Sequence, residues 1–167
     1  HLTALQQWMS ADDILSGKAF PGRKIVIIGG GSVGCELADY LAPLVNDRFP
    51  RNRDITVIEM DHEIMLQESG PGRSLLVQRL MKKGVHIQVN AKVTKVTENQ
   101  ITYIQNGIEH TIDDADTLVF ACGYQPDTAL EDMLKAAQVS YHMIGDAHQV
   151  GNIKDAIQEG YNITKAI

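Results

Sequence analysis

The chain has 167 residues, about the length of one domain, and its 15 Lys and Arg against 21 Asp and Glu give it a net charge of −6. That balance argues against nucleic acid or an anionic membrane as the main partner, because both attract basic surfaces. The 44% of hydrophobic residues excludes a disordered chain, and no apolar run approaches the roughly 18 residues of a membrane span. Cys35 and Cys122 lack the spacing of a disulfide framework, a zinc site or a dithiol pair. We therefore expect a globular, cytoplasmic protein without a metal site.

The first half of the chain alternates short apolar runs with amphipathic segments. A leading segment, residues 1–22, contains a short helix that Ser10 caps and Gly17 ends. Beyond it, β-branched runs predict strands, and apolar spacing of three or four residues predicts helices. The strands are expected at 24–28, 55–58 and 85–89, and the helices from 33 to 43 and from 71 to 83. A polar loop at 46–54 precedes the second strand, and the order β-α-β-α-β favours a parallel sheet.

The second half of the chain changes character after residue 90. Three alternating stretches, with Asn106-Gly107 as a hairpin turn, predict an antiparallel three-stranded β-meander at 92–97, 101–104 and 108–112. A buried strand is expected next, then a helix, another strand and a closing helix, at 117–121, 128–137, 141–144 and 152–167. The sequence thus predicts an α/β fold: a Rossmann-like parallel sheet with helices on both faces and an antiparallel three-stranded β-meander.

A glycine-rich turn joins the first strand to the first helix, which is the context that a dinucleotide-binding motif requires. Its residues follow the pattern G-x-G-x-x-G: Gly29, Gly30, Gly31, Ser32, Val33 and Gly34. Gly29 permits the tight turn, Gly31 leaves room for a pyrophosphate, and Gly34 lets the helix lie close to the strand. The free N–H groups at the start of that helix would then bind the phosphates. Cys35, next in the helix, is interpreted as a packing residue because no histidine is predicted beside it.

Glu59 follows the second strand, where a carboxylate can accept hydrogen bonds from both ribose hydroxyls of an adenosine. It lies further from Gly29 than the usual ~20 residues, and the 46–54 loop can absorb the difference. A carboxylate at this place repels a 2′-phosphate, and the positions from Met60 to Glu63 offer no Arg or Lys to bind one. The sequence therefore predicts NAD(H) rather than NADP(H), with Met60 also at the site.

Four segments together resemble the NAD-binding half of the pyridine-nucleotide–disulfide reductase fold: 29–36, 57–59, 119–123 and 144–146. The ending, from Ile144 through Tyr161, is similar to the C-terminus of NADH:flavin oxidoreductases of the 2,4-dienoyl-CoA reductase, enoate reductase and trimethylamine dehydrogenase type. The resemblance implies an NAD(H)-binding domain at 23–125 and a C-terminal piece of an FAD-binding domain at 126–167. The partner of the chain would then be the remainder of a larger flavoenzyme, and a start without Met fits a piece of such a protein.

The same resemblance extends the expected cofactor-binding residues. It implies that Cys122 and Gly123 belong to the NAD(H) site and that Gly145 and Asp146 contact FAD. The chain would bind NADH and deliver its hydride to a flavin, with no catalytic acid or base of its own and no activity in isolation. The final substrate would bind in a barrel domain outside this chain, so that an enoyl thioester, an enoate and an amine remain open. A non-catalytic module that senses NAD is the alternative.

Overall fold

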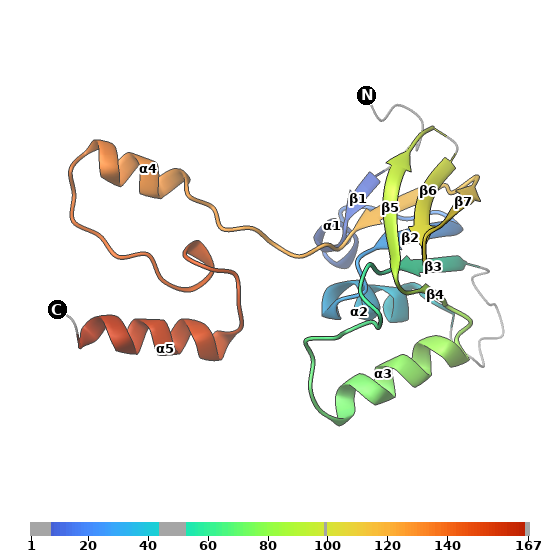
Figure 1. The fold of residues 1–167 in the computed structure, drawn as a ribbon, viewed down its shortest axis with the longest axis horizontal. Helices are drawn as coiled ribbons and strands as arrows, with labels where there is room; N and C mark the ends of the chain where they lie inside the picture. The colour runs from blue at the N-terminus through green and yellow to red at the C-terminus, as the bar shows by residue number, and fades with distance from the viewer. Residues whose placement is uncertain (1–7, 44–52, 99, 166–167) are drawn as a thin grey trace. The chain divides into compact units, whose positions relative to one another are not determined.

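The computed structural model describes residues 8–43, 53–98 and 100–165, and Figure 1 shows its helices and strands. The chain divides into two compact units, His1–Gly123 and Tyr124–Ile167. Most of the polar loop expected at 46–54 lies outside the described residues. No helix among the residues that the structure describes is long and apolar enough to cross a membrane.

A five-stranded parallel sheet forms the centre of the first unit. Its strands lie in the order β1-β8-β2-β3-β4, namely Trp8–Ser10, Thr117–Phe120, Lys24–Ile28, Asp54–Ile58 and His86–Gln88. In the register of the sheet, Ile28 at the end of β2 pairs with both Ile58 and Phe120. The carboxyl ends of β2, β3 and β8 therefore meet at one edge of the sheet, where α/β proteins bind ligands. β1 was not expected, because three residues are too few to show a period.

Helices cover one face of this sheet: α1 (Ala11–Leu15), α2 (Ser32–Leu41) and α3 (Pro71–Lys82). Ile25 and Ile27 of β2 lie in one core cluster with Leu37 of α2 and Leu80 of α3. Pro71 stands in the first turn of α3, and Gly84, with a φ of 74°, follows its end, as the sequence predicts.

The antiparallel meander packs on the other face of the sheet. It comprises β5 (Ala91–Val96), β6 (Gln100–Gln105) and β7 (Ile108–Asp113). Val26 of β2 and Leu118 of β8 lie in a second core cluster with Ile101 and Tyr103 of β6. The α/β, Rossmann-like fold is confirmed, and the expectation of helices on both faces is corrected to helices on one face and the meander on the other. An apolar run on a central strand indicates burial on both sides without showing what covers each side.

The second unit contains two helices, α4 (Ala129–Ala136) and α5 (Ile153–Thr164), and the single 3₁₀ turn η1 (Gly145–Ala147) among its described residues. Asn152 caps α5: its side chain accepts a hydrogen bond from Asp155 N, and the Asp155 carboxylate accepts one from Asn152 N. The strand expected at 141–144 is wrong, because the chain there has no strand partner within the described residues. An alternating pattern makes a strand only where a second strand supplies the hydrogen bonds.

Candidate functional site

The glycine loop between β2 and α2 is held between the ends of two neighbouring strands. Gly29 N donates to Ile58 O at 2.9 Å, and Ala121 N donates to Ile28 O at 2.8 Å. Gly29 has a φ of 107°, and a Cβ there would collide with the carbonyl oxygen of Ala121. Because both the φ and the space exclude a side chain, this position requires glycine.

Gly31 and Gly34 differ in what surrounds them. A Cβ on Gly34 would collide with the carbonyl oxygen of Gly29, so this glycine lets α2 lie directly on the loop. A Cβ on Gly31 would have no heavy atom within 4 Å, which leaves its open side free for a ligand. The first hydrogen bond within α2 runs from Cys35 N to Gly31 O at 3.0 Å. The N–H groups of Ser32, Val33 and Gly34 therefore lie outside the helical ladder, at the positive end of the helix dipole.

Glu59 lies against this loop, although it is distant in sequence. Its Oε2 accepts a hydrogen bond from Gly30 N at 2.5 Å, and its Oε1 accepts one from Asp61 N at 2.9 Å. A Cβ on Gly30 would come within 2.9 Å of Glu59 Cβ, so the second glycine of the loop makes room for the acid. Met60, the next residue, is 66% exposed. The structure thus brings the predicted glycines and the predicted carboxylate together at one strand edge.

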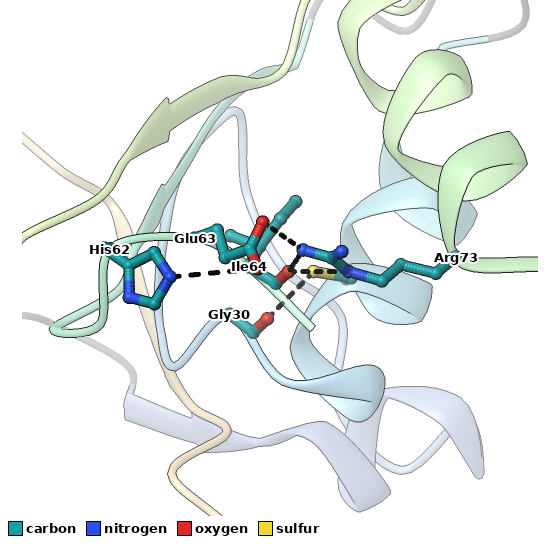
Figure 2. Close-up of polar contacts among 6 residues, drawn as sticks. Gly30, His62, Glu63, Ile64 and Arg73 are labelled. Carbon is teal, nitrogen blue, oxygen red and sulfur yellow. Dashed lines mark hydrogen bonds and ion pairs between the residues drawn. The ribbon is translucent and has the colours of Figure 1, made fainter. Parts of the chain in front are cut away.

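An ion pair that the sequence did not reveal holds the loop after β3 in place (Figure 2). Arg73, from the first turn of α3, contacts the Glu63 carboxylate at 2.6 Å, and its Nη2 and Nε donate to Ile64 O at 3.0 and 3.3 Å. The hydrogen bond from Arg73 lowers the pKa of Glu63 below its ordinary value. Met65 N then donates to Gly30 O at 2.7 Å, which joins this loop to the glycine loop. No short motif reveals Arg73, because its distance from Glu63 in the sequence is not a spacing characteristic of a helix or a strand.

The two cysteines have different surroundings. Cys35 is fully buried, and its thiol donates to Gly30 O at 3.3 Å. Burial, with the negative charges of Glu59 and Glu36, raises the pKa of Cys35 to about 12, so it stays a thiol at neutral pH. The interpretation of Cys35 as a packing residue therefore holds. Cys122 is exposed just after β8 and donates to Ile28 O at 3.3 Å, and the exposed Gly123 follows it with a φ of 85°.

A cavity of about 360 Å³ is lined by the start of α2, the loop that precedes α3, and α3 as far as Arg79. Its charged lining residues are Glu36, Glu68, Arg73 and Arg79, and Ser32 of the glycine loop also lines it. Ser32 Oγ donates to Glu68 Oε1 at 2.6 Å. The cavity is therefore next to the start of α2, where the sequence predicts phosphate binding.

Gly145 and Asp146 belong to the second unit and form a turn there. Gly145, with a φ of 59°, donates its N–H to Glu159 Oε2 at 2.7 Å, and Glu159 Oε1 lies 3.0 Å from His148 Nδ1. The side chain of Asp146 is exposed, and its Oδ1 accepts a hydrogen bond from Gly151 N at 3.2 Å. The turn therefore presents a carboxylate near the start of α5. Within the described residues, no cluster of His, Cys, Asp and Glu is arranged to hold a metal ion.

The comparisons with known proteins all point to one family. A family model described as Pyridine nucleotide-disulphide oxidoreductase matches residues 1–150. Cinnamate reductase of Clostridium sporogenes is 32% identical over 162 residues, which cover 95% of this chain and 23% of that protein. NADH oxidase of Thermoanaerobacter brockii is 29% identical over 154 residues, which cover 90% of this chain and 23% of that protein. A structure of 2-naphthoyl-CoA reductase with 2-naphthoyl-CoA matches 93% of this chain and 23% of its own, with a TM-score of 0.75 and 24% identity.

The comparisons confirm the resemblance stated from the motifs and the Rossmann-like fold class. The expected cofactors, NAD(H) and FAD, are confirmed as those of the family. The chain spans 23% of the length of each of the three relatives above.

Proposed function

Because this chain belongs to the pyridine nucleotide-disulphide oxidoreductase family, we propose that its residues 23–125 bind NADH and 126–167 are a C-terminal piece of an FAD-binding domain. The observation that carries the proposal is the open side of Gly31, which lies between the free N–H groups of α2 and the Glu59 carboxylate. In a dinucleotide site a Cβ at this position would lie where the pyrophosphate approaches the backbone, and no heavy atom of the described residues beyond its own neighbours lies within 4 Å of that place. This opening supports the proposal that the loop binds a dinucleotide.

The proposed NADH site assigns a different task to each of its parts. The backbone of the loop and the first turn of α2 bind the pyrophosphate, and Glu59 with Met60 lies beside the adenosine ribose. Cys122 and Gly123 follow β8, whose end lies beside the end of β2, and complete the proposed site. The proposed residues are Gly29, Gly30, Gly31, Ser32, Val33, Gly34, Glu59, Met60, Cys122 and Gly123.

The charges at the end of β3 favour NADH over NADPH. The Glu59 carboxylate would accept hydrogen bonds from the ribose hydroxyls and repel a 2′-phosphate. Arg73 is the first Arg or Lys that follows β3 in the sequence, and it is already paired with Glu63 and hydrogen-bonded to Ile64 O. A guanidinium held in this way is not free to neutralise a 2′-phosphate.

The second unit carries the proposed flavin contacts, Gly145 and Asp146. The exposed Asp146 carboxylate can accept hydrogen bonds from flavin hydroxyl groups, and the N-terminal turn of α5 offers N–H groups to a phosphate. Bound NADH would supply a hydride to the flavin, while this chain binds and orients the two cofactors. The parent protein would be a larger flavin-dependent oxidoreductase that acts on an enoate or enoyl-CoA, and a cinnamate reductase among the relatives supports that substrate class.

Calorimetry on the purified 167-residue chain tests this proposal, with NADH and NADPH as ligands and an absorbance scan for flavin. We expect NADH to bind more tightly than NADPH. Gly31→Val should abolish NADH binding and leave the fold intact, because its φ of −70° suits any residue and its Cβ meets open space. Gly160→Val, at a helical glycine of α5 that is also surrounded by open space, is the control. Wild-type chain that binds neither nucleotide, or that prefers NADPH, would contradict the proposal.

A further inference from the structure

One carboxylate stands at the proposed phosphate site itself. Glu68 Oε1 accepts a hydrogen bond from Ser32 Oγ at 2.6 Å, and Ser32 is the first residue of α2. Two backbone hydrogen bonds place Glu68 there: Glu68 N donates to Met65 O at 3.0 Å, and Met65 N donates to Gly30 O at 2.7 Å. The position of Glu68 thus depends on the same contacts that shape the glycine loop.

The two arginines that line the cavity pair with other acids, so the Glu68 carboxylate keeps its contact with Ser32 of α2. Glu36, Arg73 and Arg79 also line the cavity. The ion pairs of the two arginines are with Glu63 and Asp39, and not with Glu68. A carboxylate is attracted to the positive end of a helix dipole for the same reason that a phosphate is. The Glu68 carboxylate therefore takes a place that a bound pyrophosphate would take: it accepts the hydrogen bond from the Ser32 hydroxyl and puts a negative charge near the positive end of α2.

We propose that Glu68 is an affinity-determining residue of the NADH site, where its carboxylate competes with the cofactor's pyrophosphate for the Ser32 hydroxyl and the start of α2. The inference rests on the proposed function above. NADH displaces Glu68 from Ser32 when it binds, and the negative charge of Glu68 then remains close to the phosphates. Both effects weaken NADH binding in the wild-type chain.

Glu68→Gln tests this inference, because glutamine keeps the size of the side chain and removes its charge. We expect the variant to bind NADH about fivefold more tightly, the effect of removing one screened charge beside a phosphate. The gain should shrink as salt is raised, since added ions screen that repulsion, whereas a change in folding would not follow this trend. Inorganic pyrophosphate alone should show the same gain. Glu109→Gln, an exposed acid on β7, is the matched control and should leave the affinity unchanged.

Ser32→Ala shows whether the two residues act together. Without the hydroxyl, Glu68 loses its partner at α2, so Glu68→Gln should tighten NADH binding less in the Ser32→Ala background than in wild type. Wild-type chain that binds NADH with the same affinity as Glu68→Gln would overturn the role of Glu68 and leave the proposed function standing. Absence of NADH binding in wild type and in every variant would overturn the proposed function, and the role of Glu68 with it.

Discussion

The Glu59 carboxylate accepts a hydrogen bond from Gly30 N at 2.5 Å, which connects the end of β3 to the middle of the glycine loop. The contact places a negative charge beside the proposed phosphate site and makes the strand end and the loop one structural unit. A ribose with free 2′- and 3′-hydroxyls can share this carboxylate, whereas a 2′-phosphate cannot. The geometry of Glu59 is thus the basis for the expected choice of cofactor.

Glu59→Gln should reduce the preference for NADH. The amide still accepts a hydrogen bond from Gly30 N but loses the charge that strengthens hydrogen bonds from the ribose. We expect NADH affinity to fall about tenfold, and NADPH affinity to fall less or to rise. Titration of both nucleotides measures the ratio. An unchanged ratio of the two affinities would show that Glu59 does not select the cofactor.

Gly34→Ala should destabilise the first unit, because the new Cβ collides with the carbonyl oxygen of Gly29. We expect a loss of about 1–3 kcal/mol of unfolding free energy, the usual cost of overpacking. Gly31→Ala is the matched control, and its Cβ, which meets open space, should change stability by less than about 0.5 kcal/mol. Chemical denaturation measures both. Equal stabilities for the two variants would contradict the close approach of α2 to the loop.

Asp39 joins α2 to α3 through two cations. Arg79 Nε lies 2.7 Å and Lys83 Nζ 2.9 Å from Asp39 Oδ1. Burial alone would raise the pKa of Asp39, but the hydrogen bonds from Arg79 and Lys83 and their two charges outweigh it and lower that pKa. Because the pKa of Asp39 is lower in the folded state than in the unfolded state, the carboxylate stabilises the fold at pH values above its unfolded-state pKa. This stabilisation is lost as the pH falls through the folded-state pKa.

Asp39→Asn should therefore cost about 1 kcal/mol at pH 7, a magnitude reduced for partial solvent screening. The difference from wild type should disappear as pH falls from the ordinary value of 3.8 through the lower folded-state pKa. Urea denaturation across this range provides the test, with Asp132→Asn in α4 as a control of equal charge change. A difference that persists at the lowest pH would rule out the ion pairs as its source.

The Arg73–Glu63 pair should control the mobility of the loop after β3. Arg73→Lys keeps the charge and loses the double contact with Ile64 O, so the amide of Met65 should exchange its hydrogen faster. Hydrogen-exchange mass spectrometry measures this change. Lys165→Arg, in the second unit, is the comparison substitution and should leave this loop as it is. Unaltered exchange at 61–66 in Arg73→Lys would show that the pair does not hold the loop.

The two cysteines should differ in reactivity. At pH 8 we expect iodoacetamide to alkylate Cys122 much faster than Cys35. Burial raises the pKa of both thiols, but Cys122 is exposed to the reagent, whereas Cys35 is fully buried and its pKa is raised to about 12. Peptide mass spectrometry identifies the labelled residue. Labelling of Cys35 in the native chain at a rate similar to that of Cys122 would contradict its burial under the glycine loop.

Much of the fold follows from local patterns. Strand β2, the glycine loop and α2 follow each other within 18 residues, so sequence spacing alone places Gly29, Gly31 and Gly34. The strand-end position of Glu59 follows from the parallel order. The sequence did not predict that the meander would form the layer opposite the helices, because an apolar residue such as Val26 packs equally well against a helix or against a meander.

The rest of the site depends on tertiary contacts. The contact between Glu68 and Ser32 joins residues 36 positions apart, and the pair of Arg73 with Glu63 has no characteristic spacing, so neither could be predicted from a local pattern. The wrong prediction of a strand at 141–144 came instead from a local pattern. That pattern suits a strand, and strand formation needs a partner that the described part of the second unit does not provide.

The most direct test of the account is an amide chemical-shift map of the 167-residue chain titrated with NADH. Binding at the glycine loop predicts the largest shifts at the N–H groups of Gly30, Gly31 and Ser32, with a second group at Glu59 and Met60. Shifts that are absent, or that lie in the meander while the glycine loop is unchanged, would contradict the assignment of this loop as the dinucleotide site.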